Sequence, residues 1–457
     1  MAQPSELHVK GQFVGVLGAG RSGLAAAGLL ARQGARVLLS DSGRPRPRPK
    51  LPASVKLETG RHSERLLEAV LLVRSPGIPD RLPLLQKARK KGIPIWSELE
   101  LASRLICPRR LIAVTGTNGK TTTTTLVGKL FQAVDRSTQV AGNIGTPLSQ
   151  IVRRVRKNST LVLEVSSYQL ENIERFHPTI SVILNITPDH LEHHGTMRAY
   201  AAMKARIFEN QTASETCVLN ADDSRCRALA RRCPGRVLFF SRRKKLKQGI
   251  YYKGRGTSGA RGEGLVVIHW RNRHARFPLR WDLPGPHNVE NALAAIGVAV
   301  AGGLSIPVIR SVLKRFQGVE HRLEVVRRLR GVRYINDSKA TNVDSTRVAL
   351  EAFQEPLVLI MGGRGKGAPY TGLRDLVKRH VRRLLLVGED AGRIQKDLGH
   401  AVPSKRVGTL QRAVAQAARE AVPGDVVLLS PACASFDQYS NYEERGRHFK
   451  RLVLKLR

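Results

Sequence analysis

The chain has 457 residues, of which 42% are hydrophobic and 25% are charged. This length exceeds what one core sustains, so we expect two or three domains, and the composition argues against a disordered or fibrous chain. No apolar stretch reaches the roughly 18 residues of a membrane helix, and the N-terminus lacks a signal-peptide layout. Five cysteines without a Cys-x-x-Cys pair indicate reduced thiols. We expect a cytoplasmic protein without a membrane partner.

The basic excess is large, with 77 Lys and Arg residues against 36 acidic ones and a formal net charge of +41. Nucleic-acid binding is one interpretation, because clustered cations neutralise phosphates. However, aromatic residues are only 5% and are not interleaved with the basic runs at 44–50 and 242–247, as they are where bases stack. We therefore favour solvated basic faces over a nucleic-acid partner.

The first hundred residues alternate apolar strands with helices. Strands are predicted at 13–18, at 35–41 and within 69–79, and an apolar helix at 22–34 ends at a glycine. Such alternation implies a mainly parallel, doubly wound sheet of the α/β class, in which ligands bind at the carboxyl ends of strands. We assign this domain to residues 1–98.

Two further units of the same kind follow, at 99–318 and 319–457. Residues 242–282 lack helical periodicity and are expected to form short strands and loops. Helices are expected after Lys120 and within 287–303. Strands are predicted within 111–115, 160–167, 180–190, 332–342, 357–367, 383–390 and 425–435.

The first glycine loop, Gly18 to Gly23, fits Gly-x-Gly-x-x-Gly between a strand and a helix, and Asp41 ends the next strand. This pattern is typical of dinucleotide binding, with the acid on the ribose. It also suits the diphosphate of any nucleotide-linked substrate, or a tight turn with no ligand. The loop alone does not distinguish NAD from UDP.

The second glycine loop, "TGTNGKTTTTT" from Thr115, is a stronger signal. Val114 stands where the usual phosphate-loop spacing has its first glycine, so this is a shorter variant. Its glycines let backbone N–H groups close on phosphate oxygens, Lys120 neutralises charge, and Thr121 can bind Mg²⁺. A basic turn without a ligand is the weaker interpretation, because a strand precedes the loop and a long helix follows.

Acidic and imidazole side chains follow two neighbouring strands of this unit. Glu164 ends one apolar run, and Asp189 and His190 follow the next. Oxygen and nitrogen donors of this kind around Mg²⁺ suit phosphoryl transfer from ATP.

The motifs "TGTNGKTT", "GNIGTPL", "LEVSSYQLE", "NITPDHLEHHG", "PGPHNVENALAA", "EHRLE", "NDSKATN" and "SPACASFDQY" occur in the order seen in the Mur ligase family. The resemblance covers nearly the whole chain and is greatest to the members that add D-glutamate. It implies a Rossmann-like N-terminal domain for UDP, a central ATPase of the P-loop type, and a Rossmann-like C-terminal domain that binds the amino acid and closes on ATP.

The same resemblance implies the reaction. ATP activates the carboxylate of UDP-N-acetylmuramoyl-L-alanine as an acyl phosphate, and D-glutamate attacks it, in peptidoglycan precursor synthesis. Mg²⁺, as two ions, and a monomeric enzyme are expected. Because the substrates supply the nucleophiles, no Ser-His-Asp arrangement is needed, and the protein positions and stabilises charge.

Site residues are carried over position by position. The implied ATP site comprises Gly116, Thr117, Asn118, Gly119, Lys120, Thr121, Thr122, Asn288, Asn291, Arg322 and Asp337. The implied site of the UDP-linked substrate comprises Arg21, Ser22, Asp41, Ser42, Ser75, Gly77, Asn143 and Ser166. The implied D-glutamate pocket comprises Lys339, Thr341, Lys366, Ser435, Phe436 and Tyr442.

The implied catalytic residues are Lys120, Glu164, His190 and Lys204, and the implied metal ligands are Thr121, Glu164, His190 and Lys204. Lys204 matches the lysine that the family carries as a carbamate. The plainer alternative is a solvated lysine on a helix. One position departs from the pattern: Gly365 stands where the family's Gly-Gly-x-Asp-Lys-Gly has an acid, beside Lys366.

Other functions remain open from the residues alone. A function as an NAD-dependent dehydrogenase would explain the first glycine loop but would give the second glycine loop no role. Another Mur-type or a folylpolyglutamate-type amide ligase would share the central motif, although the latter should lack the N-terminal unit. A nucleic-acid-binding ATPase is suggested by charge alone.

Overall fold

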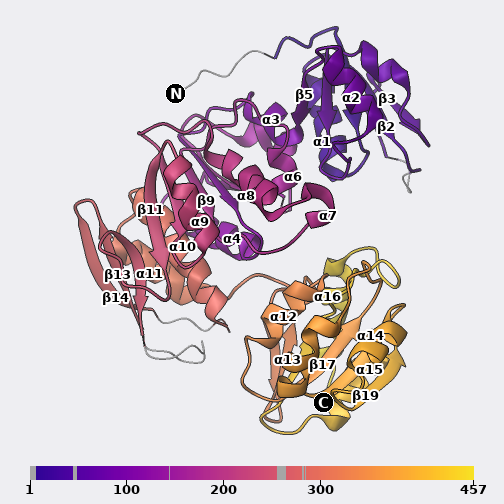
Figure 1. Cartoon of the computed structure of the whole chain (residues 1–457), viewed down its shortest axis with the longest axis vertical. Helices are drawn as coiled ribbons and strands as arrows, with labels where there is room; N and C mark the ends of the chain where they lie inside the picture. Colours follow the sequence, from indigo (N-terminus) through magenta and orange to yellow (C-terminus); the bar gives the residue numbers. More distant parts are fainter. Residues whose placement is uncertain (1–6, 45–48, 144, 255–263, 280–282, 284) are drawn as a thin grey trace. The chain divides into compact units, whose positions relative to one another are not determined.

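The computed structural model (Figure 1) describes residues 7–44, 49–143, 145–254, 264–279, 283 and 285–457. Most of the basic run 44–50 therefore lies outside the described residues. The chain divides into two compact units, which are described separately below. The first comprises Met1–Lys253, Leu265–Phe277 and Glu290–Leu313, and the second comprises Gly254–Gly264, Pro278–Val289 and Lys314–Arg457.

The first sheet of the chain has five parallel strands. Its elements are β1 (Phe13–Leu17), α1 (Arg21–Arg32), β2 (Arg36–Asp41), β3 (Val55–Thr59), η1 (Glu64–Glu68), β4 (Leu71–Arg74), α2 (Pro83–Lys90), β5 (Ile95–Ser97) and α3 (Glu98–Ser103). The strand order is β3-β2-β1-β4-β5, so the winding direction reverses between β1 and β4. In such sheets the ligand crevice lies at this switch, outside the carboxyl ends of the two strands.

The second sheet, also in the first unit, has nine strands. They are β6 (Arg110–Thr115), β7 (Gln139–Gly142), β8 (Thr160–Glu164), β9 (Ile180–Ile183), β10 (Thr216–Asn220), β11 (Arg236–Ser241), β12 (Gly249–Lys253), β13 (Gly264–Trp270) and β14 (Arg273–Leu279). The order β14-β13-β12-β11-β10-β9-β6-β8-β7 places β6 between β8 and β9. The carboxyl ends of these three parallel strands therefore meet at one edge.

Helices and short turns connect this second sheet. They are α4 (Lys120–Gln132), α5 (Leu148–Ile151), η2 (Val152–Arg154), α6 (Ser167–Leu170), α7 (Leu191–His194), α8 (Met197–Ala205), η3 (Arg206–Phe208), α9 (Ser224–Leu229), η4 (Ala230–Arg232), α10 (Pro286–Ala301) and α11 (Ile306–Arg315). Leu126, Val127, Leu130 and Phe131 of α4 are fully buried. This packing fixes the helix whose first turn follows the second glycine loop.

The third sheet belongs to the second unit and has six strands. Its elements are β15 (Glu324–Leu329), β16 (Val332–Asn336), α12 (Val343–Leu350), β17 (Leu357–Gly362), η5 (Thr371–Leu373), α13 (Arg374–His380), β18 (Val381–Val387), α14 (Ala391–Leu398), β19 (Ser404–Gly408), α15 (Leu410–Glu420), β20 (Val426–Leu429) and α16 (Tyr442–Leu454). The order is β15-β16-β20-β17-β18-β19, and all pairs except β15 with β16 are parallel.

The prediction of mainly parallel, doubly wound sheets is confirmed. The strands expected in the apolar runs are present, and β12, β13 and β14 are the short strands expected within 242–282. Seven strands were not expected: β3, β5, β7, β10, β11, β15 and β19. Of these, β3, β5, β7 and β19 are short or polar and gain their pairing from the sheet. Within the described residues, no helix is both long and apolar enough to cross a membrane.

Candidate active site

The loop between β6 and α4 has the form of a phosphate-binding turn. Gly116 and Gly119 have φ values of 153° and 84°, where a side chain would be strained. A Cβ on Gly119 would also lie 2.1 Å from Asn291 Oδ1 on α10. The first turn of α4 follows at once, and a helix N-terminus favours phosphate oxygens. The N–H groups of Thr117 and Asn118 donate to Asn185 at 3.0 and 2.8 Å and so hold the loop in shape.

Two lysines meet at the carbonyl oxygen of Gly116. Lys120 Nζ donates to it at 2.8 Å and to Thr117 O at 2.7 Å, and Lys204 Nζ from α8 donates to the same Gly116 oxygen at 3.0 Å. Lys204 is only 1% exposed. Burial, and next the positive charge of Lys120, hold the pKa of Lys204 well below its usual value. The alternative of a solvated lysine at this position is therefore wrong.

Glu164 lies at the carboxyl end of β8 beside this loop's strand and is 3% exposed. Its Oε1 accepts a hydrogen bond of 2.8 Å from Asn143 Nδ2, and its backbone oxygen accepts one from Asn143 N. Its Oε2 is buried and has no hydrogen-bond partner among the described residues. A buried carboxylate oxygen without a donor is costly unless a cation or a proton satisfies it.

His190 begins α7 with a φ of 53°, an uncommon conformation for a residue other than glycine. Its Nε2 lies 3.4 Å from Asp189 Oδ2, and its Nδ1 lies 3.6 Å from Glu192 Oε1. The ring meets the edge of Tyr168, with centroids 5.1 Å apart, and its side chain is 41% exposed. The ring is thus held in a distinct orientation while it stays open to solvent.

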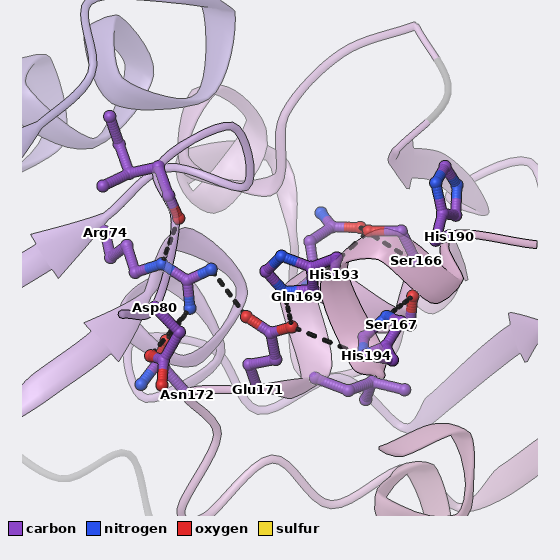
Figure 2. Close-up of polar contacts among 12 residues, drawn as sticks. Arg74, Asp80, Ser166, Ser167, Gln169, Glu171, Asn172, His190, His193 and His194 are labelled. Carbon is purple, nitrogen blue, oxygen red and sulfur yellow. Dashed lines mark hydrogen bonds and ion pairs between the residues drawn. The ribbon is translucent and has the colours of Figure 1, made fainter. Parts of the chain in front are cut away.

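A buried arginine connects the first sheet to the second, and it was missed by the sequence interpretation. Figure 2 shows Arg74, at the end of β4, pointing at Glu171 and Asn172. Its Nη2 donates to Glu171 Oε2 at 2.6 Å, its Nη1 to Asn172 Oδ1 at 2.6 Å, and its Nε to Ile78 O at 2.7 Å. Arg74 is 2% exposed. The available signal was a lone arginine ending the apolar run "AVLLVR", since a buried guanidinium needs partners.

The other oxygen of Glu171 contacts the histidine pair of α7. Glu171 Oε1 lies against His193 Nε2 and 3.8 Å from His194 Nδ1, while His194 Nε2 contacts Ser167 Oγ at 3.0 Å (Figure 2). Arg74 and this acid therefore hold together the end of β4, the end of α6 and the helix α7, which follows His190. Ser166 caps α6, with its Oγ accepting from Gln169 N.

The loop at the switch point of the first sheet is closely packed. Gly18 has a φ of 92°, and a Cβ on Gly23 would lie 1.8 Å from Gly18 O. Ser75 Oγ, from the end of β4, donates to Gly18 O at 3.2 Å. Asp41 binds the loop itself, because its Oδ2 accepts from Ala19 N at 2.6 Å and its Oδ1 accepts from Gly43 N at 2.7 Å.

The remaining predicted residues around this loop lie toward solvent. Arg21 Nη1 donates to Gly145 O of the central domain at 3.4 Å. Ser42 and Gly77 are exposed, and Ser22 is half-buried in the first turn of α1. The structure thus brings the end of β1 and the end of β4 together, as the glycine fingerprint predicted for a ligand edge.

In the second unit, Asp337 follows β16 and is buried. Its Oδ2 accepts from Ser430 Oγ at 2.9 Å and its Oδ1 accepts from Leu323 N at 3.2 Å. Burial raises its pKa to about 7, although the nearby Arg322 charge opposes that shift. Arg322 and Asp337, predicted together, are therefore close enough to interact.

The residues predicted for the amino acid lie at the ends of β16, β17 and β20 in this same unit. Lys339 Nζ lies 5.6 Å from the ring centroid of Tyr442, Ser435 is buried, and Phe436 is 63% exposed. Lys366 is exposed in the glycine-rich turn after β17. Arg445 was not predicted; it is buried and donates to Ser338 Oγ at 3.0 Å and to Cys433 O at 3.1 Å. It joins the turns after β16 and β20.

Two groups of three metal-binding side chains come together within the described residues. They are Glu171 with His193 and His194, and Glu320 with His321 and Glu324. Protein cations already neutralise both, since Arg74 binds Glu171 and Lys450 binds Glu320 and Glu324. Neither group includes Glu164 or His190. By contrast, the partnerless Glu164 Oε2 and the Thr121 hydroxyl position at the start of α4 fit a hard cation that prefers oxygen ligands.

Comparison with known proteins gives matches along most of the chain. Family models match residues 12–97 as a Mur ligase MurD-like N-terminal domain, 114–299 as a Mur ligase middle domain, and 321–433 as a Mur ligase glutamate ligase domain. UDP-N-acetylmuramoylalanine–D-glutamate ligases from Koribacter versatilis and Anaeromyxobacter dehalogenans are each 45% identical to this chain. The alignments cover 98% and 99% of it, and 99% of each relative. The chain belongs to the Mur ligase family.

Solved structures show the same fold at lower identity. The UDP-N-acetylmuramate-alanine ligase from Thermotoga maritima matches with a TM-score of 0.61 at 20% identity, covering 97% of this chain and 99% of that one. The D-alanyl-D-alanyl-adding ligase from Acinetobacter baumannii matches with a TM-score of 0.57 at 18% identity, covering 93% and 86%. The three-domain α/β architecture of Mur ligases is therefore confirmed.

Membership of the Mur ligase family excludes one of the functions left open by the residues, the NAD-dependent dehydrogenase. The interpretation of the chain as an NAD-dependent dehydrogenase is wrong, because all three domains match a ligase family that uses ATP. A phosphate loop with two lysines on one carbonyl agrees with that assignment. The prediction that the enzyme uses ATP is thus supported. The glycine loop of the first sheet belongs to a Mur ligase N-terminal domain.

Proposed function

We propose that this Mur ligase joins D-glutamate to UDP-N-acetylmuramoyl-L-alanine and releases ADP and phosphate. The observation that carries the proposal is the full-length similarity, at 45% identity, to ligases named for this reaction. The γ-phosphoryl group of ATP passes to the substrate carboxylate, giving an acyl phosphate and ADP. The amine of D-glutamate then attacks the acyl carbon, and phosphate leaves as the amide forms and the amine loses a proton.

The chain's own residues bind and orient the reactants. The glycine loop, the N-terminus of α4 and the ammonium of Lys120 are assigned to the ATP phosphates, with Gly116, Thr117, Asn118, Gly119 and Thr122 around them. Such positioning and charge stabilisation account for most of the catalysis in phosphoryl transfer. Asn288 and Asn291 of α10 are assigned to the nucleotide, as are Arg322 and Asp337 of the second unit.

Thr121, Glu164, His190 and Lys204 are proposed to hold Mg²⁺, as two ions. When bound, Mg²⁺ would neutralise charge on the phosphate oxygens during transfer. The buried Glu164 Oε2 without a partner is the observation that favours a cation there. His190 remains a proposed ligand, since its ring is oriented by Asp189, Glu192 and Tyr168.

Lys204 is proposed to react with CO₂ and become a carbamate. Its neutral amine attacks the carbon of CO₂, and the adduct loses a proton to give an anionic oxygen donor. Burial and the Lys120 charge favour the neutral amine that this step needs. An ammonium beside Lys120 would instead add repulsion at Gly116 O, where the site needs negative charge.

The other proposed residues hold the two substrates. The switch-point edge of the first sheet and two central positions are assigned to the UDP-linked substrate: Arg21, Ser22, Asp41, Ser42, Ser75, Gly77, Asn143 and Ser166. The strand ends of the second unit are assigned to D-glutamate, whose two carboxylates suit cations and hydroxyls: Lys339, Thr341, Lys366, Ser435, Phe436 and Tyr442. We further propose a monomeric cytoplasmic enzyme, because ATP and the nucleotide-linked substrate are cytoplasmic and all five cysteines are free thiols.

The test is ADP release with UDP-N-acetylmuramoyl-L-alanine while the amino acid is varied. We expect turnover with D-glutamate and none above background with L-glutamate or meso-diaminopimelate. Omitting the UDP-linked substrate should abolish ADP release. Equal turnover with L-glutamate would overturn the assignment to D-glutamate ligation, and turnover with meso-diaminopimelate alone would move the chain to another Mur ligase reaction.

A further inference from the structure

The glycine-rich turn after β17 carries Gly365, where the resemblance to the Mur ligases led us to expect an acid. Gly365 is not among the glycines with positive φ, so its backbone would accept an ordinary side chain. The space beside it is nevertheless filled. A Cβ on Gly365 would lie 1.9 Å from Asp390 Oδ2 and 2.9 Å from the Tyr370 hydroxyl oxygen. A carboxylate from another turn therefore stands where a side chain of residue 365 would begin.

Asp390 is held in that place by three contacts. The Tyr370 hydroxyl donates to its Oδ2 at 2.6 Å, and its backbone N–H donates to Gly363 O at 2.9 Å. Arg393 lies 4.0 Å from the same oxygen. Burial raises the pKa of Tyr370, so the hydroxyl remains a donor at neutral pH. The Asp390 side chain is 22% exposed, which leaves it partly desolvated.

The neighbouring contacts tie the turn of Lys366 to both adjacent strand ends. Arg364 forms a two-pronged pair with Glu389, with nitrogen–oxygen distances of 3.0 and 2.9 Å. The backbones of Arg364 and Ala434 exchange two hydrogen bonds of 2.9 Å, immediately before Ser435. The turn is thus fixed between the loops after β18 and β20, and Asp390 is the carboxylate packed closest to Gly365.

We propose that Asp390 is a positioning residue for the amino-acid pocket, supplying through space the carboxylate that residue 365 does not carry. This deepens the proposed function, because it rests on Lys366 facing a carboxylate of D-glutamate. The two positions share one volume, so a side chain at residue 365 would displace the Asp390 carboxylate from its present place. The carboxylate fixes the turn and offsets the charge of Lys366, which keeps this flexible cation oriented when D-glutamate is absent.

The test moves the carboxylate from one position to the other. Asp390→Ala should raise the KM for D-glutamate about three- to tenfold, with kcat and the KM for ATP within about twofold of the starting enzyme. Gly365→Asp should lower both activity and melting temperature, because two carboxylates would occupy one volume. In the double variant Gly365→Asp/Asp390→Ala, the KM for D-glutamate should fall most of the way back to that of the starting enzyme.

Gly365→Ala/Asp390→Ala is the matched control, since it relieves the overlap without restoring a carboxylate. This control should keep the raised KM for D-glutamate. If Gly365→Asp/Asp390→Ala has a KM no lower than that of the control, the proposal is overturned. Asp390→Asn keeps the shape of the side chain and removes its charge. An unchanged KM for D-glutamate in this variant would also overturn the proposal. If the starting enzyme does not use D-glutamate, the proposed function fails. The melting temperatures of Asp390→Ala, Gly365→Asp and the two double variants would still show whether residues 365 and 390 compete for one volume.

Discussion

Lys204 is a residue whose surroundings restrict what it can do. It is buried beside Lys120, its pKa is lowered, and both amines donate to the same carbonyl oxygen. A long cationic side chain is rarely buried without an acidic partner. The proposed conversion to a carbamate would remove this positive charge, which is why we propose it for a lysine at this position.

The prediction at the residue scale follows from this. Lys204→Ala should nearly abolish ADP release while circular dichroism shows an intact fold. Millimolar formate or acetate should partly restore turnover, because a small carboxylate replaces the lost oxygen donor. Formate or acetate should not restore turnover to Lys120→Ala, since this substitution removes a cation and not an oxygen donor. Near-normal turnover of Lys204→Ala in CO₂-depleted buffer would contradict the carbamate.

At the scale of elements, Arg74 binds Asn172 and Glu171 just after α6, and Glu171 in turn contacts His193 of α7. Ser75, Ser166 and His190, all proposed site residues, border these elements. A buried ion pair contributes specificity of arrangement more reliably than net stability, because desolvation offsets much of its attraction. The arginine therefore acts as a positioning residue between the first two sheets.

Arg74→Met should cost about 3–5 kcal/mol of unfolding free energy, because the buried Glu171 loses its arginine and keeps its contacts to His193 and His194. The double variant Arg74→Met/Glu171→Gln should recover much of that loss, as chemical denaturation would show. Lys87→Ala, which breaks the exposed pair with Glu64 in the same domain, is the control and should change stability little. If Arg74→Met alone is as stable as this control, the buried pair has no positioning role.

At the scale of the whole molecule, the net charge of +41 acts on every reactant, because ATP and the UDP-linked substrate are anions. A strongly positive field raises the local concentration of anions and their association rate. Salt weakens it, since the screening length is about 10 Å at 0.1 M.

We therefore expect kcat/KM for the UDP-linked substrate to fall several-fold as monovalent salt rises from about 20 to 200 mM, with kcat changing less. Steady-state kinetics at saturating ATP would measure this, with a neutral osmolyte as the control. Added duplex DNA should not stimulate ADP release. Salt-independent kcat/KM would leave the charge without a role in substrate capture, and DNA-stimulated turnover would favour the nucleic-acid interpretation.

Much of this protein was determined by its sequence alone. Continuous apolar runs, glycines at strand ends and the Lys120 turn predicted three α/β units and the ATP loop, because each is a local pattern whose physics needs few distant partners. The tertiary structure decided the rest. It buried Lys204 on the Gly116 carbonyl, gave Glu164 Oε2 no partner within the described part of the chain, paired Arg74 with Glu171 and placed Asp390 against Gly365. The residues that meet in these contacts are 25 to 97 positions apart in the Arg74, Lys204 and Asp390 cases, so only strand order and helix packing set their burial, charge and shared volume.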